Sequence, residues 1–217
     1  MSVQPPAAAQ PLLRGYLHLA GALVSPFALL LLLFIADSPR GYVGGAIFGT
    51  GLIILYTTSA MHHLMPLGRR LGAVIHRLDR SIIFIFIAGA YAPFAIKLMS
   101  NAWGIPVMSV VGALALGGFI TTLAAPQAPR WIRVGLYVGL GWIGIVAISE
   151  LWTSLPGRAF AMLVLSGLLY SAGGLTYALQ RPNPFPRVFG YHELFHALQM
   201  AATALIYTVV ALDVLGS

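Results

Sequence analysis

Residues 19–36 read LAGALVSPFALLLLLFIA, an apolar run of eighteen residues without a single charge. A helix needs about 20 apolar residues to cross the hydrocarbon core of a bilayer, so this run has the length and character of a membrane span. Only Arg14 flanks it on the amino side, and no small-x-small cleavage motif follows it. These flanks favour a first membrane anchor over a cleaved signal peptide.

The composition of the whole chain extends this interpretation. Of its 217 residues, 59% are hydrophobic and only 8% are charged, whereas soluble domains carry roughly a quarter charged residues. Six further apolar runs predict an all-α integral membrane bundle of seven transmembrane helices. The expected spans are 16–36, 43–64, 81–99, 105–124, 134–153, 160–179 and 190–212.

The expected domain organisation is simple. We expect residues 16–217 to form a single transmembrane domain, with no room for a separate soluble domain. Residues 1–15 are expected to form a disordered cytoplasmic segment, because the stretch MSVQPPAAAQP is rich in Pro and Ala.

Missing residue types and scattered charges exclude several functions. The chain has no Cys, which excludes disulfides, thiolate metal ligands and thiol nucleophiles, so any metal must be bound through nitrogen or oxygen. The net charge of +7 comes from single or paired basic residues between apolar runs, not from a basic stripe. Membrane lipids are therefore the expected partners, and nucleic acid is not.

The basic residues predict the orientation in the membrane, since cytoplasmic loops collect Lys and Arg. Nine of the twelve precede the first span or lie in the second, fourth and sixth loops: Arg14, Arg69, Arg70, Arg77, Arg80, Arg130, Arg133, Arg181 and Arg187. The other three lie in the odd-numbered loops: Arg40, Lys97 and Arg158. This split predicts a multi-pass protein of the bacterial inner membrane, with a cytoplasmic N-terminus and an external C-terminus.

Histidines gather in the half of the bundle that this orientation places at the cytoplasm. His192 and His196 are four residues apart on one helix face, a spacing that lets two imidazoles bind one metal ion. Ser59 and His63 have the same spacing at the end of the second span, and Asp79 lies where the third span is expected to begin. If these helix ends meet, three imidazoles, a carboxylate and a hydroxyl surround one point, which suits zinc.

Simpler interpretations of these residues stay open. An Asp at a helix start is ordinarily an N-cap, which is the plain interpretation of Asp79 taken alone. His62 competes with His63 as the ligand, because it is three residues from Ser59. Interfacial or supporting roles are expected for three histidines: His18, His62 and His76.

The same segment admits an enzyme of another kind. Residues 192–196 read HELFH, the H-E-x-x-H pattern in which a Glu is the base of a metalloprotease. Glu193 is turned about a quarter-circle from His192 on a helix, and Asp213 is the only later acid, so this interpretation is weaker.

Two pairs of glycines four residues apart stand out on the expected helices: Gly45 with Gly49, and Gly135 with Gly139. Such pairs serve helix dimerisation or close packing inside a bundle, and we expect the second role.

Three stretches resemble the signature regions of the hemolysin III family, the bacterial branch of the progestin and adipoQ receptors (PAQR), which more distantly resembles the alkaline ceramidases. They are TTSAMHHLMP (57–66), HRLDRSIIFIFIAGAYAPF (76–94) and FGYHELFHALQ (189–199). The resemblance covers nearly the whole chain, and the three motifs together are specific.

The resemblance implies a metal site. Its ligands would be three histidines: His63, His192 and His196. Ser59 and Asp79 would complete the site, and His18 matches a His usual near the amino end of the family. The chain departs from the family pattern at three places. The Glu and Asn that often precede the first His are absent, Arg80 replaces a His common after the Asp, and Ile206 stands where many bacterial members have another His.

The family resemblance implies a zinc-dependent hydrolase of lipid amide or ester bonds with a role in membrane homeostasis. Asp79 would accept a proton from water, and Ser59 would help to hold the oxyanion. A non-catalytic seven-helix receptor or regulator with a structural metal is the alternative. Haem ligation is a weaker third, since haem needs axial ligands on opposite sides of one macrocycle.

The predicted orientation can be tested with reporters fused after Ser217. We expect alkaline phosphatase, which folds only outside the cytoplasm, to be active there, and a fluorescent protein that folds only in the cytoplasm to be dark. The reverse pattern would overturn the orientation and, with it, the expected depth of the histidines.

Overall fold

Seven helices in the computed structural model, which describes residues 11–216, are long and apolar enough to cross a membrane. Four spans are single helices: α1 (Tyr16–Ile35), α2 (Pro39–Leu64), α4 (Asn101–Ala124) and α7 (Gly157–Leu179). Three contain a short π or 3₁₀ segment: α3 (Arg69–Pro93) with η1 (Phe94–Leu98), α5 (Arg130–Trp142) with η2 (Ile143–Ala147) and α6 (Ile148–Ser154), and α8 (Tyr191–Val209) with η3 (Val210–Leu215). The predicted all-α, seven-span fold is confirmed.

The start of the third span differs from the sequence prediction. Helix α3 begins at Arg69, twelve residues before the predicted start at residue 81. The polar stretch 69–80 continues the helix beyond the apolar segment, and hydropathy alone does not register it. Asp79 therefore lies inside α3 rather than at its start, so the N-cap interpretation of Asp79 is wrong.

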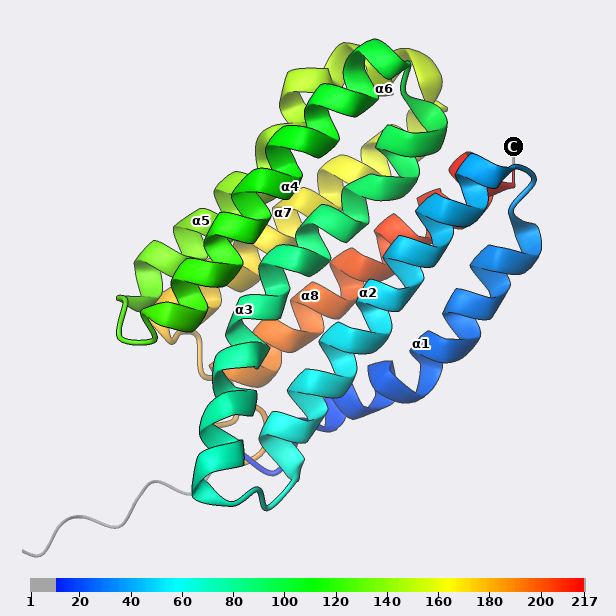
Figure 1. Ribbon diagram of the computed structural model, residues 1–217. Helices are drawn as coiled ribbons and strands as arrows, with labels where there is room; N and C mark the ends of the chain where they lie inside the picture. Colours follow the sequence, from blue (N-terminus) through cyan, green and yellow to red (C-terminus); the bar gives the residue numbers. More distant parts are fainter. Residues whose placement is uncertain (1–10, 217) are drawn as a thin grey trace, which may run out of the picture.

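Helix α8 lies in the interior of the bundle. It passes behind α2 and α3 and packs along α7, while α1 packs on the outer side of α2 (Figure 1). Phe48 and Phe84 fill the core between the spans. Large apolar side chains such as Phe27 and Phe34 point outward, as expected for a surface that faces lipid.

The break in the fifth span is held by one tyrosine. The Tyr91 hydroxyl donates a hydrogen bond to the carbonyl of Gly141 at 2.6 Å and accepts one from the Gly144 amide at 2.8 Å. These bonds satisfy backbone groups at the junction of α5 and η2, which lipid cannot satisfy. Two residues later, Pro93 has no amide hydrogen to donate, and the π segment η1 follows it directly.

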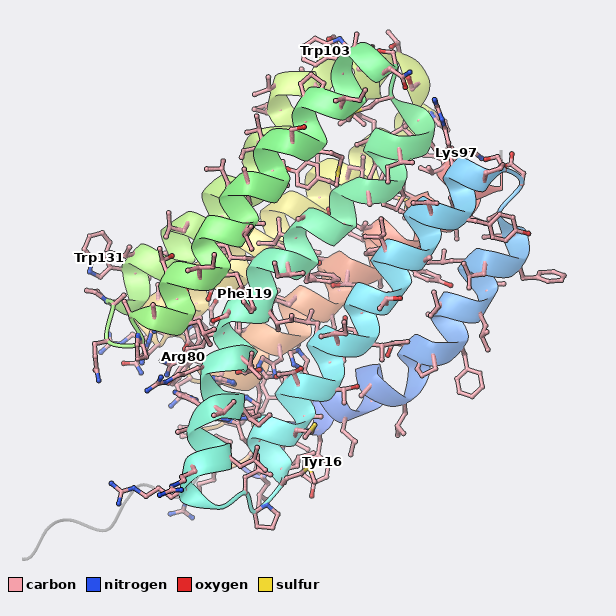
Figure 2. The ribbon with its side chains drawn as sticks, viewed as in Figure 1. Tyr16, Arg80, Lys97, Trp103, Phe119 and Trp131 are labelled. Atoms are coloured by element: carbon pink, nitrogen blue, oxygen red, sulfur yellow. The ribbon has the colours of Figure 1, made fainter. Side chains whose placement is uncertain are left out.

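The two ends of the bundle differ in charge. One end, which we call the histidine end, contains His63 and His192, and Arg80 lies on that side in Figure 2. At the opposite end, the Lys97 ammonium lies 2.8 Å from the Asp37 carboxylate. The hydrogen bond from Lys97 holds the pKa of Asp37 below its ordinary value, so this ion pair joins the α1–α2 loop to η1.

The segment before α1 is partly described. Leu12 donates its amide to the carbonyl of Arg187 at 3.0 Å, and Leu13 donates to Val188 at 3.1 Å. Leu12 and Leu13, which lie in the segment expected to be disordered, are thus hydrogen-bonded to the α7–α8 loop. The remainder of the expected disordered segment, residues 1–10, lies outside the described residues.

The two glycine pairs have different surroundings. A Cβ atom at Gly49 would lie 2.6 Å from Leu29, and one at Gly45 would lie 3.0 Å from Leu215, so this pair packs inside the bundle as expected. A Cβ atom at Gly135 or Gly139 would meet no described atom within 4 Å. The expectation of close packing is therefore wrong for the α5 pair.

A glycine on α4 offers a test of the packing. A Cβ atom at Gly104 would lie 2.1 Å from the carbonyl oxygen of Ala95, and backbone cannot easily move aside. We expect Gly104→Ala to lower stability by about 1–3 kcal/mol, the usual cost of overpacking. Gly112→Ala, on the same helix with no atom within 4 Å, is the control and should leave stability unchanged or slightly raised. Thermal unfolding in detergent measures both, and equal midpoints would contradict the close approach.

Candidate metal centre

Three histidine side chains from two helices converge at the histidine end. His63 is the penultimate residue of α2, and His192 and His196 occupy the first turns of α8. The Nε2 atoms of His63 and His192 are 3.1 Å apart, and one nitrogen of each of the three rings lies within 4.8 Å of the others. Nitrogen ligands on a tetrahedral zinc ion are about 3.3 Å apart, so this group is able to hold a single metal ion.

Asp79 and Ser59 lie beside this group. An Asp79 oxygen and one nitrogen each of His62 and His63 lie within 4.8 Å of one another. Ser59 is buried one helical turn before His63 and is placed to donate a hydrogen bond to the Asp79 carboxylate. The structure therefore brings the five candidate residues from the sequence to one place.

The neighbouring histidines have separate positions. His63 faces the two histidines of α8, whereas the Nε2 atom of His62 lies 3.0 Å from the Nδ1 atom of His76. Both residues of the His62–His76 pair are half-buried. This pair flanks the three-histidine group on the side of α3.

His18 supports the group from α1. Its ring stacks face to face on His196, with centroids 3.7 Å apart and planes 2° apart, and the edge of Tyr56 packs against it. Neither ring nitrogen of His18 has a hydrogen-bond partner among the described residues. His18 therefore contacts His196 through its ring face, and this stacking fixes the orientation of the His196 imidazole.

Glu193 is directed away from a catalytic role. Its carboxylate accepts a hydrogen bond from the Gly190 amide at 2.8 Å, which caps the start of α8, and it also binds the Arg14 guanidinium. Only 1% of its surface is exposed. A carboxylate held by these two partners links the N-terminal segment to α8. Glu193 is therefore not free to act as the general base of a metalloprotease.

An apolar cavity of about 280 Å³ extends from the histidine end into the membrane-spanning part of the bundle. His192, His196 and Asp79 line one part of it, and Leu151 and Phe160, from the opposite end, line another. Its wall is built mainly from α3, α5, α7 and α8. A chamber of this kind suits a long apolar molecule with one polar end.

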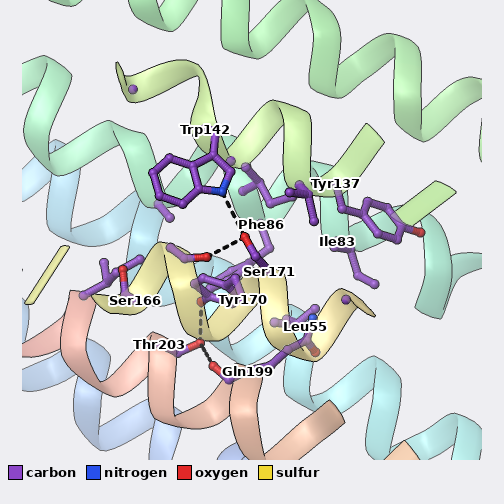
Figure 3. A pocket seen from close by; sticks show the side chains of 18 of the residues that line it. Leu55, Ile83, Phe86, Tyr137, Trp142, Ser166, Tyr170, Ser171, Gln199 and Thr203 are labelled. Atoms are coloured by element: carbon purple, nitrogen blue, oxygen red, sulfur yellow. Dashed lines mark hydrogen bonds between the residues drawn. The ribbon is translucent and has the colours of Figure 1, made fainter. Parts of the chain in front are cut away.

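Polar side chains interrupt the apolar wall, and the sequence reasoning missed them. The Trp142 indole donates to the Ser171 hydroxyl at 2.9 Å, and the hydroxyls of Tyr170 and Thr203 are 2.7 Å apart (Figure 3). Gln199 lies beside Thr203. Thr203 and Gln199 follow His196 by seven and three residues on the same helix face, which is the sequence signal that could have found them.

Fold and site together define a seven-helix integral membrane protein with a histidine group able to bind a metal at one end. The profile of the "Haemolysin-III related" family matches residues 7–207. The chain therefore belongs to the hemolysin III family, and the resemblance of its three motifs to that family is confirmed.

Relatives of known name are similar over most of the chain. The Hemolysin-3 homolog of Bacillus subtilis is 29% identical over 193 residues, which covers 88% of this chain and 87% of that protein. Hemolysin-3 of Bacillus cereus is 29% identical over 205 residues, covering 91% and 89%. The adiponectin receptor protein of Drosophila melanogaster is 30% identical over 181 residues, covering 76% of this chain and 41% of the receptor.

Proposed function

We propose that this protein is a zinc-dependent membrane hydrolase that cleaves an amide or ester bond of a membrane lipid and so contributes to membrane homeostasis. The observation that carries the proposal is the convergence of three imidazoles, a carboxylate and a hydroxyl at an apolar cavity. The cavity would take the acyl chain, and the polar cluster would take the scissile carbonyl.

The donor set supports zinc as the metal. His63, His192 and His196 would hold the ion through three nitrogen atoms, the ligand number found in catalytic zinc sites that keep a fourth position open. A zinc ion held there supplies a Lewis acid and lowers the pKa of coordinated water to about 7. Stacking by His18 would keep one of the three rings in its binding orientation.

Asp79 and Ser59 would carry the proton chemistry. Asp79 lies next to the three-histidine group and would accept the proton of the attacking water, then return it to the leaving amine or alcohol. Ser59 would orient the Asp79 carboxylate and donate a hydrogen bond to the developing oxyanion. Both residues come from within long helices, which hold them rigidly.

The proposed orientation places this chemistry at the cytoplasmic leaflet of the inner membrane. Its support is the distribution of basic residues, nine of which precede the first span, lie in the sixth loop, or lie at the ends of α3 and α5 next to the second and fourth loops. Those loops join the spans at the histidine end. Lipid would then enter with its polar part toward the cytoplasm.

A receptor or regulator with a structural metal is the second candidate. The observation that favours it is the position of Asp79, whose oxygen lies within 4.8 Å of a ring nitrogen of His63. If Asp79 binds the ion as a fourth protein ligand, the site is closed, as in structural zinc sites.

Metal content tests the ligand set. We expect purified protein to carry about one zinc ion per chain, and His196→Ala to lose it, because each ligand fixes the geometry of the others. His76→Ala removes a histidine from the same end but not from the three-histidine group, so it should keep the metal. Elemental analysis after dialysis measures both, and stoichiometric zinc in His196→Ala would reject the assignment.

The Asp79→Asn variant tests the chemistry. Asn keeps the size of Asp and one acceptor oxygen but cannot accept the proton, so we expect kcat to fall roughly a hundredfold or more with zinc retained. Hydrolysis of a panel of lipid amides and esters, with metal content measured alongside, gives the answer. Equal rates would reject Asp79 as the base, and no turnover by zinc-loaded wild type would favour the receptor.

A further inference from the structure

Gln199 has an unusual place in the cavity. It is a half-buried residue of α8 that lines the cavity, and its backbone carbonyl accepts a hydrogen bond from Thr203 at 2.9 Å. Its side-chain amide forms no hydrogen bond with any other described residue, although it offers two donor hydrogens and an acceptor oxygen. The amide thus faces the cavity with its hydrogen-bonding capacity unused.

The neighbouring polar groups in the wall are paired. Trp142 donates to Ser171, and Tyr170 pairs with Thr203 (Figure 3). An amide in an apolar wall has few partners within the protein, and a fully buried unpaired amide costs roughly 2–7 kcal/mol, so the half-buried Gln199 amide favours a partner in the cavity. A ligand that supplies a hydrogen-bonding partner in the cavity would offset that cost.

The helix fixes the position of Gln199 relative to the metal-binding group. Gln199 follows His196 by three residues, so both side chains lie on one face of α8, about 4.5 Å apart along its axis. A lipid with its carbonyl at the histidines would therefore place the first carbons of its acyl chain beside Gln199.

We propose that Gln199 binds a hydroxyl group on the acyl chain of the lipid, close to the carbonyl, so that the substrates are 3-hydroxyacyl lipids. This inference rests on the proposed function, because that function places the carbonyl at the histidines. A neutral amide both donates to and accepts from a hydroxyl, whereas it leaves the charge of a phosphate or a carboxylate uncompensated. The hydroxyls of Tyr170 and Thr203 are bonded to each other, so the Gln199 amide is the group left to bind the ligand hydroxyl.

The size of the preference follows from the chemistry of one neutral hydrogen bond. We expect a 3-hydroxyacyl ligand to bind roughly threefold to tenfold more tightly than its unsubstituted analogue. A hydroxyl at the far end of the chain would lie beyond Gln199 and should bring no gain.

Binding of free fatty acids tests this inference without turnover. The probes are dodecanoic acid, 3-hydroxydodecanoic acid and 12-hydroxydodecanoic acid, titrated calorimetrically into the full-length, zinc-loaded protein in a neutral detergent. The variant is Gln199→Leu, which removes the amide, and the control is Gln127→Leu, the same change in the exposed α4–α5 loop. We expect wild type and control to prefer the 3-hydroxy acid, and Gln199→Leu to bind all three alike.

Several results would overturn the proposal: wild type that binds the three acids equally or binds none, a Gln199→Leu variant that keeps the preference, or an equal gain from the 12-hydroxy acid. Should Gln199→Leu fail to fold, Gln199→Met carries the same comparison with a side chain of similar length. A Gln199-dependent preference without hydrolysis of any lipid would sustain the hydroxyl site and reject the hydrolase. Hydrolysis of lipids without a preference for the 3-hydroxy acid would support the hydrolase and reject the hydroxyl site.

Discussion

Lipid hydrocarbon offers no hydrogen bonds, and this constraint governs the whole molecule. It explains why the spans are helices, whose backbone groups pair internally, and why departures from the α-helix are few and supported. The junction of α5 and η2 is possible because Tyr91 reaches across from α3 to bind Gly141 and Gly144. Likewise, Thr and Ser side chains in the spans return their hydroxyls to carbonyls of their own helix, as Thr203 does to Gln199.

The same constraint concentrates polar chemistry where partners exist. Glu193 is almost completely buried and is acceptable there because Arg14 and the amino end of α8 surround its carboxylate. Within the described residues, the three histidines form no ion pair, and a ring nitrogen of each lies within 4.8 Å of the others. Binding of a cation would satisfy all three at once, whereas three separate hydrogen bonds would each need their own acceptor.

Much of this fold could be predicted from the sequence, because long apolar runs have few alternatives to a membrane helix. The sequence was a poorer guide to helix ends that are polar and to packing that depends on tertiary contacts. Polar residues 69–80 concealed the true start of α3, and the surroundings of Gly135 depend on which helix neighbours α5. Spacing identified His192 with His196, but only tertiary structure brings His63 within reach of them. Spacing also puts Gln199 on the helix face of His196, but only the tertiary structure shows that this face lines a cavity.

The distance along the chain between the members of the histidine group has a consequence for biosynthesis. His63 and His192 are 129 positions apart, on the second and seventh spans. A ribosome-bound chain in which only the first six spans have been inserted holds one of the three imidazoles, and α8 has yet to enter between α1 and α7. If the group binds zinc as proposed, metal loading would follow insertion of the last span, and a chain truncated before Tyr191 would reach the membrane with only one of the three histidines.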